Sequence, residues 1–94
     1  MLQVELTDDR IDVSRVLAHV ASDRAGASVV FTGTTRQDTN GLTTDWLEYE
    51  AYEPMAVAEM KKIVCSLESQ WQGVRVAMVH RLGVVPLQEC SVVI

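Results

Sequence analysis

The sequence predicts a single two-layer α+β domain that spans residues 1–94. Apolar residues recur with helical spacing in two segments and with strand patterns in four or five others, in the order β-α-β-β-α-β-β. The 94 residues are enough for one core, and 48% of them are hydrophobic and 22% charged, as in ordinary globular proteins. A ferredoxin-like βαββαβ arrangement is the alternative that uses similar elements.

The first strand and the first helix are predicted near the N-terminus. Leu2, Val4 and Leu6 alternate with polar residues, which is the period of a half-buried strand. A helical apolar stripe follows, with Asp12 as its predicted N-cap and Gly26 as its predicted stop. The apolar members of this stripe are Val13, Val16, Leu17, Val20 and Ala21.

The next strand is predicted over residues 27–32, which are apolar at nearly every position. Such a run is typical of a strand buried on both faces, so we expect it in the centre of the sheet. The polar residues 34–45 follow, with an Asn40-Gly41 turn signal in their middle. Because loops of this length are often functional, we expect either a lid or partner-binding segment or the tip of a mobile hairpin.

A third strand and the main helix are predicted over residues 46–73. Alternation places Glu48 and Glu50 on one strand face, where two carboxylates could serve acid/base chemistry or a divalent metal. Solvated strand carboxylates are the commoner case, and we favour that interpretation. Pro54 is expected to open the helix and Gly73 to end it. The apolar face of the helix, expected in the core, comprises Val57, Met60, Val64, Leu67 and Trp71.

The remaining residues predict two further strands. Residues 74–80 alternate, residues 82–86 are expected to turn the chain, and residues 90–94 form the last strand. This last strand ends in Val92, Val93 and Ile94 without a polar cap or a returning helix. We therefore expect it to be an exposed sheet edge that another subunit covers.

Charge, cysteines and targeting signals disfavour several classes of protein. The net charge of −5 argues against a nucleic-acid partner, since binding to a phosphate backbone needs a basic face. Cys65 and Cys90 have no zinc-ligand spacing to each other or to His19 and His80, so we expect no metal and no cofactor. No signal peptide or membrane span is visible, which predicts a cytoplasmic protein.

The strongest candidate for a binding segment is the end of the predicted second strand, where Gly33, Thr34 and Thr35 lead to Arg36. A guanidinium offers a rigid fork of donors that matches a phosphate or carboxylate, so Arg36 is a candidate anion-binding group. Arg81 is the other visible candidate. A solvated loop arginine is the commoner case, and a small-anion-binding domain is one possible function of the chain.

Three sequence blocks together resemble the large, catalytic subunit of molybdopterin synthase, the MoaE family. They are residues 30–36 (VFTGTTR), 47–56 (LEYEAYEPMA) and 79–83 (VHRLG), in the order and approximate spacing of that family. The resemblance implies an α/β-hammerhead-like domain, here truncated. It also implies that Thr34, Thr35 and Arg36 line the substrate pocket, and that His80-Arg81 matches a pair at a strand end with a structural role.

The same resemblance implies an enzyme of molybdenum cofactor biosynthesis. Its large subunits form a homodimer with a small ubiquitin-like sulfur-carrier subunit at each end. The thiocarboxylated tail of the small subunit delivers sulfur to cyclic pyranopterin monophosphate, and two transfers build the molybdopterin dithiolene. The lysines and a second His-Arg pair that the family uses lie beyond the equivalent of Ile94, so we expect these 94 residues to be inactive alone. The alternative is a non-catalytic interaction module.

Overall fold

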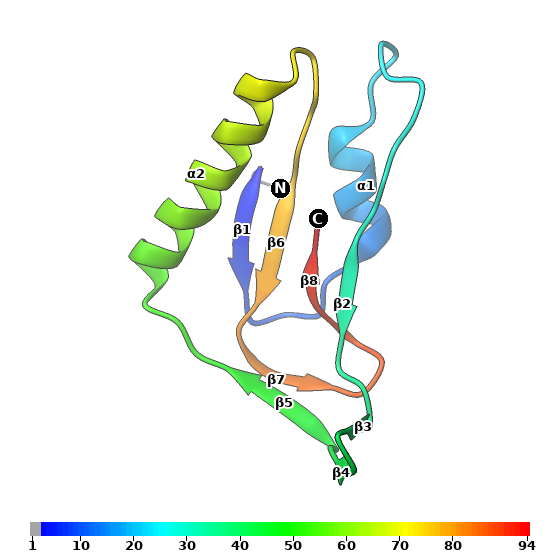
Figure 1. The fold of residues 1–94 in the computed structure, drawn as a ribbon, viewed down its shortest axis with the longest axis vertical. Helices are drawn as coiled ribbons and strands as arrows, with labels where there is room; N and C mark the ends of the chain where they lie inside the picture. Colours follow the sequence, from blue (N-terminus) through cyan, green and yellow to red (C-terminus); the bar gives the residue numbers. More distant parts are fainter. Residues whose placement is uncertain (1–2) are drawn as a thin grey trace.

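The computed structural model describes residues 3–94, apart from the side chain of Thr39 (Figure 1). The described part contains two helices, α1 (Val13–Val20) and α2 (Glu53–Gln70). Its strands in the first half are β1 (Val4–Thr7), β2 (Thr32–Thr34), β3 (Asp38–Thr39), β4 (Leu42–Thr43) and β5 (Trp46–Tyr49). Its strands in the second half are β6 (Met78–Arg81), β7 (Gly83–Pro86) and β8 (Cys90–Val93). The fold is therefore mixed α/β, as expected, with more and shorter strands than predicted.

The main sheet has four strands in the order β1-β6-β8-β2. β1 and β6 are parallel, whereas β8 runs antiparallel to both β6 and β2. β8 is thus an inner strand, and Ile94 extends its pairing through two backbone hydrogen bonds with Phe31, of 2.7 and 2.9 Å. The prediction that the last strand is an uncovered edge was wrong, because β2 returns to pair with it.

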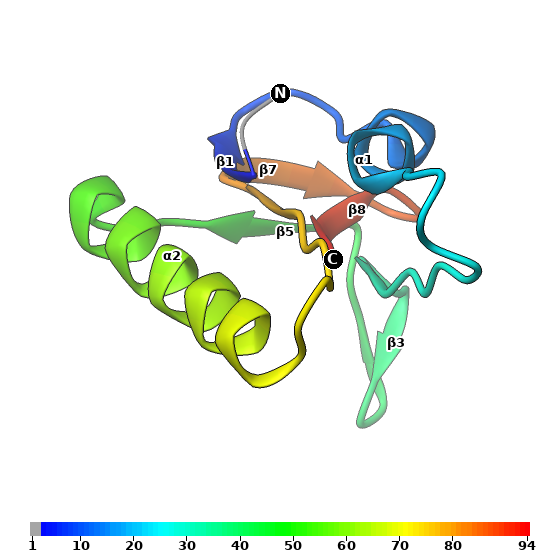
Figure 2. The same cartoon turned by 90° about the horizontal axis from the view of Figure 1, so that it is seen from above.

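The two helices pack on opposite faces of this sheet (Figure 2). Successive strand residues point to opposite faces, and Val79 packs with the α1 side while Met78 packs with the α2 side. The core on the α1 face comprises Ile11, Val16, Ala77, Val79 and Val93. The core on the α2 face comprises Val4, Met60, Val64 and Met78. The two-layer prediction was wrong, as was the ferredoxin-like alternative, since both place the helices on one face. The hammerhead-like class stays a prediction.

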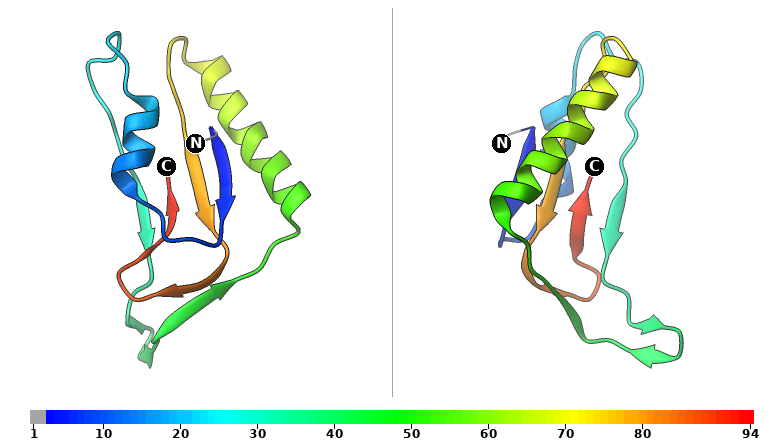
Figure 3. Two further views of the ribbon diagram at one scale, coloured as in Figure 1. Left: turned by 180° about the vertical axis from the view of Figure 1, so that it is seen from behind. Right: turned by 60° about the vertical axis from the view of Figure 1, so that its left-hand side comes forward.

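A second, two-stranded ribbon of β5 and β7 lies across the end of the main sheet (Figures 1 and 3). The sequence predicted a turn over residues 82–86, but Gly83–Pro86 is a strand that pairs with β5. Gly83 makes the bend from β6 into β7 with a φ of 80°. β3 and β4 form a hairpin in which Asn40 and Gly41 have φ of 51° and 80°, as a tight two-residue hairpin turn requires. The turn predicted at Asn40-Gly41 is thus confirmed as the tip of a hairpin, while the mobility of residues 34–45 and their role as a lid or partner-binding segment stay predictions.

The helix starts follow the sequence signals better than the helix ends do. The Oδ1 of Asp12 accepts the Ser14 N–H at 3.0 Å, which confirms the predicted N-cap of α1. Pro54 lies in the first turn of α2, as predicted. Gly26 does not stop α1, because Ala21 already leaves helical geometry. Trp71 was expected in the core but is exposed, because α2 ends one residue before it.

Residues 27–32 were expected to form a buried central strand, and this was wrong. Val29 is 92% exposed and Phe31 is 60% exposed, and β2 begins only at Thr32, on the edge of the main sheet. An apolar run is buried on both faces only if other elements cover both faces. Every one of residues 27–31 is exposed, so this condition is not met.

Candidate functional site

The candidate site lies where β2 leaves the sheet toward the β3–β4 hairpin (Figure 1). Gly33 lets β2 approach β8 closely, since a Cβ built there would meet the Val92 Cγ1 at 2.8 Å. The pairing register between β2 and β8 shifts between Gly33 and Thr34. Such a bulge redirects the strand, and it does so immediately before the predicted site residues Thr34, Thr35 and Arg36.

Thr35 is buried and hydrogen-bonded to β7 and to the turn between β7 and β8. It is 2% exposed, and its hydroxyl donates to the carbonyl oxygen of Val85 at 3.1 Å. Its backbone N–H donates to the Glu89 carbonyl at 3.3 Å, and its own carbonyl accepts the Gln88 N–H at 3.0 Å. The Thr35 hydroxyl is thus used within the protein, where it ties β2 to residues fifty positions away.

Thr34 and Arg36 are exposed on either side of buried Thr35. A hydroxyl and a guanidinium, both of which can donate hydrogen bonds to an anion, thus stand at exposed positions two residues apart. Of the three residues that the sequence predicted, Thr34 and Arg36 present their side chains to the surface and Thr35 does not.

Two separate half-buried polar contacts, one of Arg81 and one of His80, adjoin this segment, and the sequence revealed neither; as neighbours in β6 these two side chains lie on opposite faces of the sheet. The Nη1 of Arg81 is 2.7 Å from the Oε1 of Glu89, and the two side chains are 11% and 27% exposed. The Nδ1–H of His80 donates to the Ser91 carbonyl at 2.7 Å, since a carbonyl only accepts. The ring of Tyr49 meets the His80 ring edge-on at 5.2 Å. These contacts support the predicted structural role of His80-Arg81. No sequence signal placed Arg81 beside Glu89, because their pairing depends on β7 and on the turn that follows it.

The described residues offer little for a metal. Across residues 3–94 no three His, Cys, Asp or Glu side chains come together as a metal site. Glu48 and Glu50 are both exposed, as the solvated interpretation expects. Cys65 and Cys90 are free thiols. Within the same range no helix is long and apolar enough to cross a membrane.

The family model described as "MoaE protein" matches residues 6–94, which is nearly the whole chain. The chain belongs to the MoaE family. It is 43% identical over 94 residues to the molybdopterin synthase catalytic subunit of Bacillus subtilis, of which it covers 60%. It is 47% identical over 91 residues to that of Pyricularia oryzae, of which it covers 50%. The chain thus spans half or somewhat more of these relatives.

Solved structures agree with this membership of the MoaE family. The structure of molybdopterin synthase from Staphylococcus aureus superposes on 99% of this chain with a TM-score of 0.93 and 34% identity, and 68% of that chain is covered. The MoaE protein of Burkholderia ambifaria gives a TM-score of 0.83 at 27% identity, with 61% of that chain covered. The arrangement of strands and helices described above is therefore one that solved relatives share.

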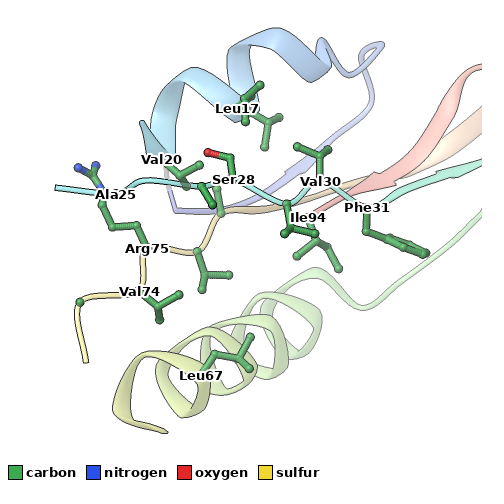
Figure 4. Close-up of a pocket in the computed structure, with 16 residues that line it drawn as sticks. Leu17, Val20, Ala25, Ser28, Val30, Phe31, Leu67, Val74, Arg75 and Ile94 are labelled. Carbon is green, nitrogen blue, oxygen red and sulfur yellow. The ribbon is translucent and has the colours of Figure 1, made fainter. Parts of the chain in front are cut away.

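This MoaE-family chain also has an apolar cleft, of about 410 Å³, away from the predicted site (Figure 4). Leu17 and Val20 of α1 lie on one side of it, Leu67 of α2 lies on the other, and Val30 and Ile94 lie between them. The Arg75 guanidinium donates to the carbonyl oxygens of His19 (3.1 Å) and Ala21 (3.4 Å) at one end. The cleft contains none of the predicted site residues, so it is not the anion site that the sequence suggested.

The two adjacent threonines allow a direct test of the structural role of Thr35. Thr35→Val keeps the shape but removes the donor to Val85, so the unfolding free energy should fall by about 1–3 kcal/mol. Thr34→Val, at an exposed position, should change it by less than about 0.5 kcal/mol. Urea unfolding followed by circular dichroism measures both values. Equal stability of the two variants would contradict the structural role of Thr35.

Proposed function

We propose that this chain works as part of a molybdopterin synthase catalytic subunit in molybdenum cofactor biosynthesis. In this role it takes part in sulfur transfer from a thiocarboxylated small subunit to cyclic pyranopterin monophosphate. The observation that carries the proposal is the family match over residues 6–94, together with relatives at 43% and 47% identity that are named molybdopterin synthase catalytic subunit. The chain spans only 60% and 50% of those two relatives, so their activity is carried over to it as a proposal.

Within this function, Thr34 and Arg36 bind the phosphate of the pterin substrate, and Thr35 holds them in place from inside. The Arg36 guanidinium supplies charged donors, and the Thr34 hydroxyl supplies another donor beside it. With a net charge of −5, the chain as a whole repels an anion, so its binding depends on donors placed locally. Exposed Thr34 and Arg36, on either side of a buried anchor, support this assignment.

The proposed partners follow from the same function. A small ubiquitin-like sulfur carrier supplies the thiocarboxylate on its Gly-Gly tail, and a second copy of the large subunit completes a homodimer with a carrier at each end. A narrow passage favours a tail of glycines, because glycine has no side chain that would obstruct entry. Nucleic acid and membranes have no place in this function. The cytoplasmic location stays a prediction.

The catalytic amines of this reaction are proposed to lie in the part of the relatives that these residues do not match. The two lysines of the chain, Lys61 and Lys62, are exposed on α2, and Lys62 lies 3.7 Å from Glu59. Figure 1 places α2, the helix of both lysines, beside β1 at one edge of the main sheet and β2, the strand of Thr34, at the other edge. The 94 residues are therefore proposed to bind ligands without completing the transfer.

This function is tested by comparing the 94 residues alone with a chimera that contains them. The 94 residues alone should give no sulfur transfer from a thiocarboxylated small subunit to cyclic pyranopterin monophosphate. A chimera in which they replace the aligned part of the Bacillus subtilis catalytic subunit should form molybdopterin, detected as its fluorescent oxidation product. The unmodified Bacillus subtilis subunit is the positive control.

Three outcomes of the comparison would contradict the proposal. Turnover by the 94 residues alone would show that the catalytic groups have been placed wrongly. A folded chimera that captures the small subunit but makes no product would favour the non-catalytic interaction module. A folded chimera that binds neither the small subunit nor the pterin would remove this chain from molybdopterin synthesis.

A further inference from the structure

We propose that the Arg81–Glu89 ion pair positions the anion-binding segment Thr34–Arg36 without contacting the substrate. This inference rests on the proposed function of that segment. Three connected sets of contacts carry it: one fixes Arg81 in the sheet, one joins Arg81 to Glu89, and one joins the Glu89 turn to Thr35. In this scheme Arg81 and Glu89 are positioning residues, and Arg36 is the binding residue.

The backbone at Arg81 is held by the main sheet. It ends β6, an inner strand with β1 on one side and β8 on the other. In the β1–β6 register it lies opposite Thr7, whose carbonyl accepts the next backbone N–H, that of Leu82, at 2.8 Å. A site built on an inner strand is held more accurately than one built on a loop. The Arg81 side chain therefore extends from a backbone position that the sheet holds in place.

The ion pair transfers this fixed position to the β7–β8 turn. The Arg81 Nη1 donates to the Glu89 Oε1 at 2.7 Å, a distance typical of a strong charged hydrogen bond. Both side chains are mostly buried, at 11% and 27% exposure. Water therefore competes little for either group, and the pair restrains the turn more than an exposed pair would.

The β7–β8 turn, once held by the ion pair, in turn holds the backbone of Thr35. The Glu89 carbonyl accepts the Thr35 N–H, and the Gln88 N–H donates to the Thr35 carbonyl. Gln88 has a φ of 67°, in the left-handed region that few residues other than glycine adopt easily. A strained residue of this kind keeps its conformation only while its surroundings hold it. Release of Glu89 should therefore loosen Gln88, and with it the hold on Thr35.

Stability alone does not account for this pair. The Arg81 Nε is buried and has no hydrogen-bond partner among residues 3–94. A buried and incompletely satisfied guanidinium is costly, and apolar replacements of buried ion pairs are often neutral or stabilising. These costs are consistent with a pair whose role is to position the neighbouring anion-binding segment. A misplaced donor in that segment weakens binding even if the fold is intact.

The test separates binding from stability. In the double variant R81M/E89L, apolar side chains replace both charges, so the urea midpoint should stay close to that of the wild type. Its affinity for cyclic pyranopterin monophosphate should nevertheless fall about fivefold to tenfold with Arg36 intact. Amide exchange at Thr35 and Gln88 should become faster in the same variant. The conservative variant R81K, which keeps the charge, should recover part of the affinity.

One control variant and one substitute for the double variant complete the test. Glu59→Gln removes the charge from the exposed Lys62–Glu59 pair on α2 and should change neither affinity nor exchange at Thr35. If R81M/E89L does not fold, Glu89→Gln takes its place, with a smaller but measurable loss of affinity expected. Unchanged affinity in a folded pair variant would overturn the positioning role. A wild-type chain that does not bind the pterin phosphate would instead overturn the proposed function.

Discussion

Alanine in place of Arg36 is expected to weaken the binding of cyclic pyranopterin monophosphate about 10- to 150-fold. A hydrogen bond to a charged group contributes about 1.5–3 kcal/mol, and the substitution removes the whole guanidinium. Arg36 is exposed at the start of the stretch that leads to β3, so its loss should leave the core unaffected. Isothermal titration of the pterin phosphate into the wild type and the variant measures the difference, and urea unfolding checks that the fold is retained.

Two further variants decide whether the effect belongs to Arg36. Arg36→Lys keeps the charge but loses the planar fork, so its affinity should fall between those of the wild type and the alanine variant. Arg24→Ala removes the same charge from the connection between α1 and β2, whose bend lies at the other end of the molecule from the β3–β4 hairpin (Figure 1). It should bind as the wild type does. An equal loss at Arg24 would mean that only net charge matters, and no loss at Arg36 would exclude that residue from the site.

Local signals predicted the local features of this fold. The cap at Asp12, the helix start at Pro54 and the hairpin turn at Asn40-Gly41 each depend on the few residues around them, and all three were confirmed. Features that depend on distant partners were missed. Residues 27–31 have the composition of a buried strand but lie in the open, and Gly83–Pro86 contains turn residues but pairs with β5.

In the candidate site, too, features set by neighbouring residues were predicted and features that depend on distant residues were not. Its place at a strand end followed from the Gly33–Arg36 sequence, because an apolar run that changes into small polar residues marks the end of a strand. The burial of Thr35 could not be predicted, since its hydroxyl partner, Val85, is fifty residues away. The Arg81–Glu89 pair was hidden for a related reason: it needs β7 and its turn to bring Glu89 back beside β6.

Replacement of Met60 by alanine is expected to lower the unfolding free energy by about 2–5 kcal/mol, the largest loss of stability we predict. The α2 face of the main sheet has a small buried core, in which Met60 and Val64 of the helix meet Val4 and Met78 of the strands. Met60 is 8% exposed, and alanine would leave a cavity that its few neighbours fill only in part. Since domains of this size are stable by about 5–15 kcal/mol, this one change removes a large share.

Met55 provides the matched control, because it is the same residue type on the same helix and is 61% exposed. Met55→Ala should change the unfolding free energy by less than about 0.5 kcal/mol, since alanine is the strongest helix former and no buried contact is lost. Urea unfolding of both variants with a common slope gives the comparison. A similar small effect at both positions would show that α2 does not depend on the Met60 contacts. Its position over β1 and β6 would then have to come from its polar contacts, such as the 2.6 Å hydrogen bond from the Gln3 Nε2 to the Glu68 Oε1.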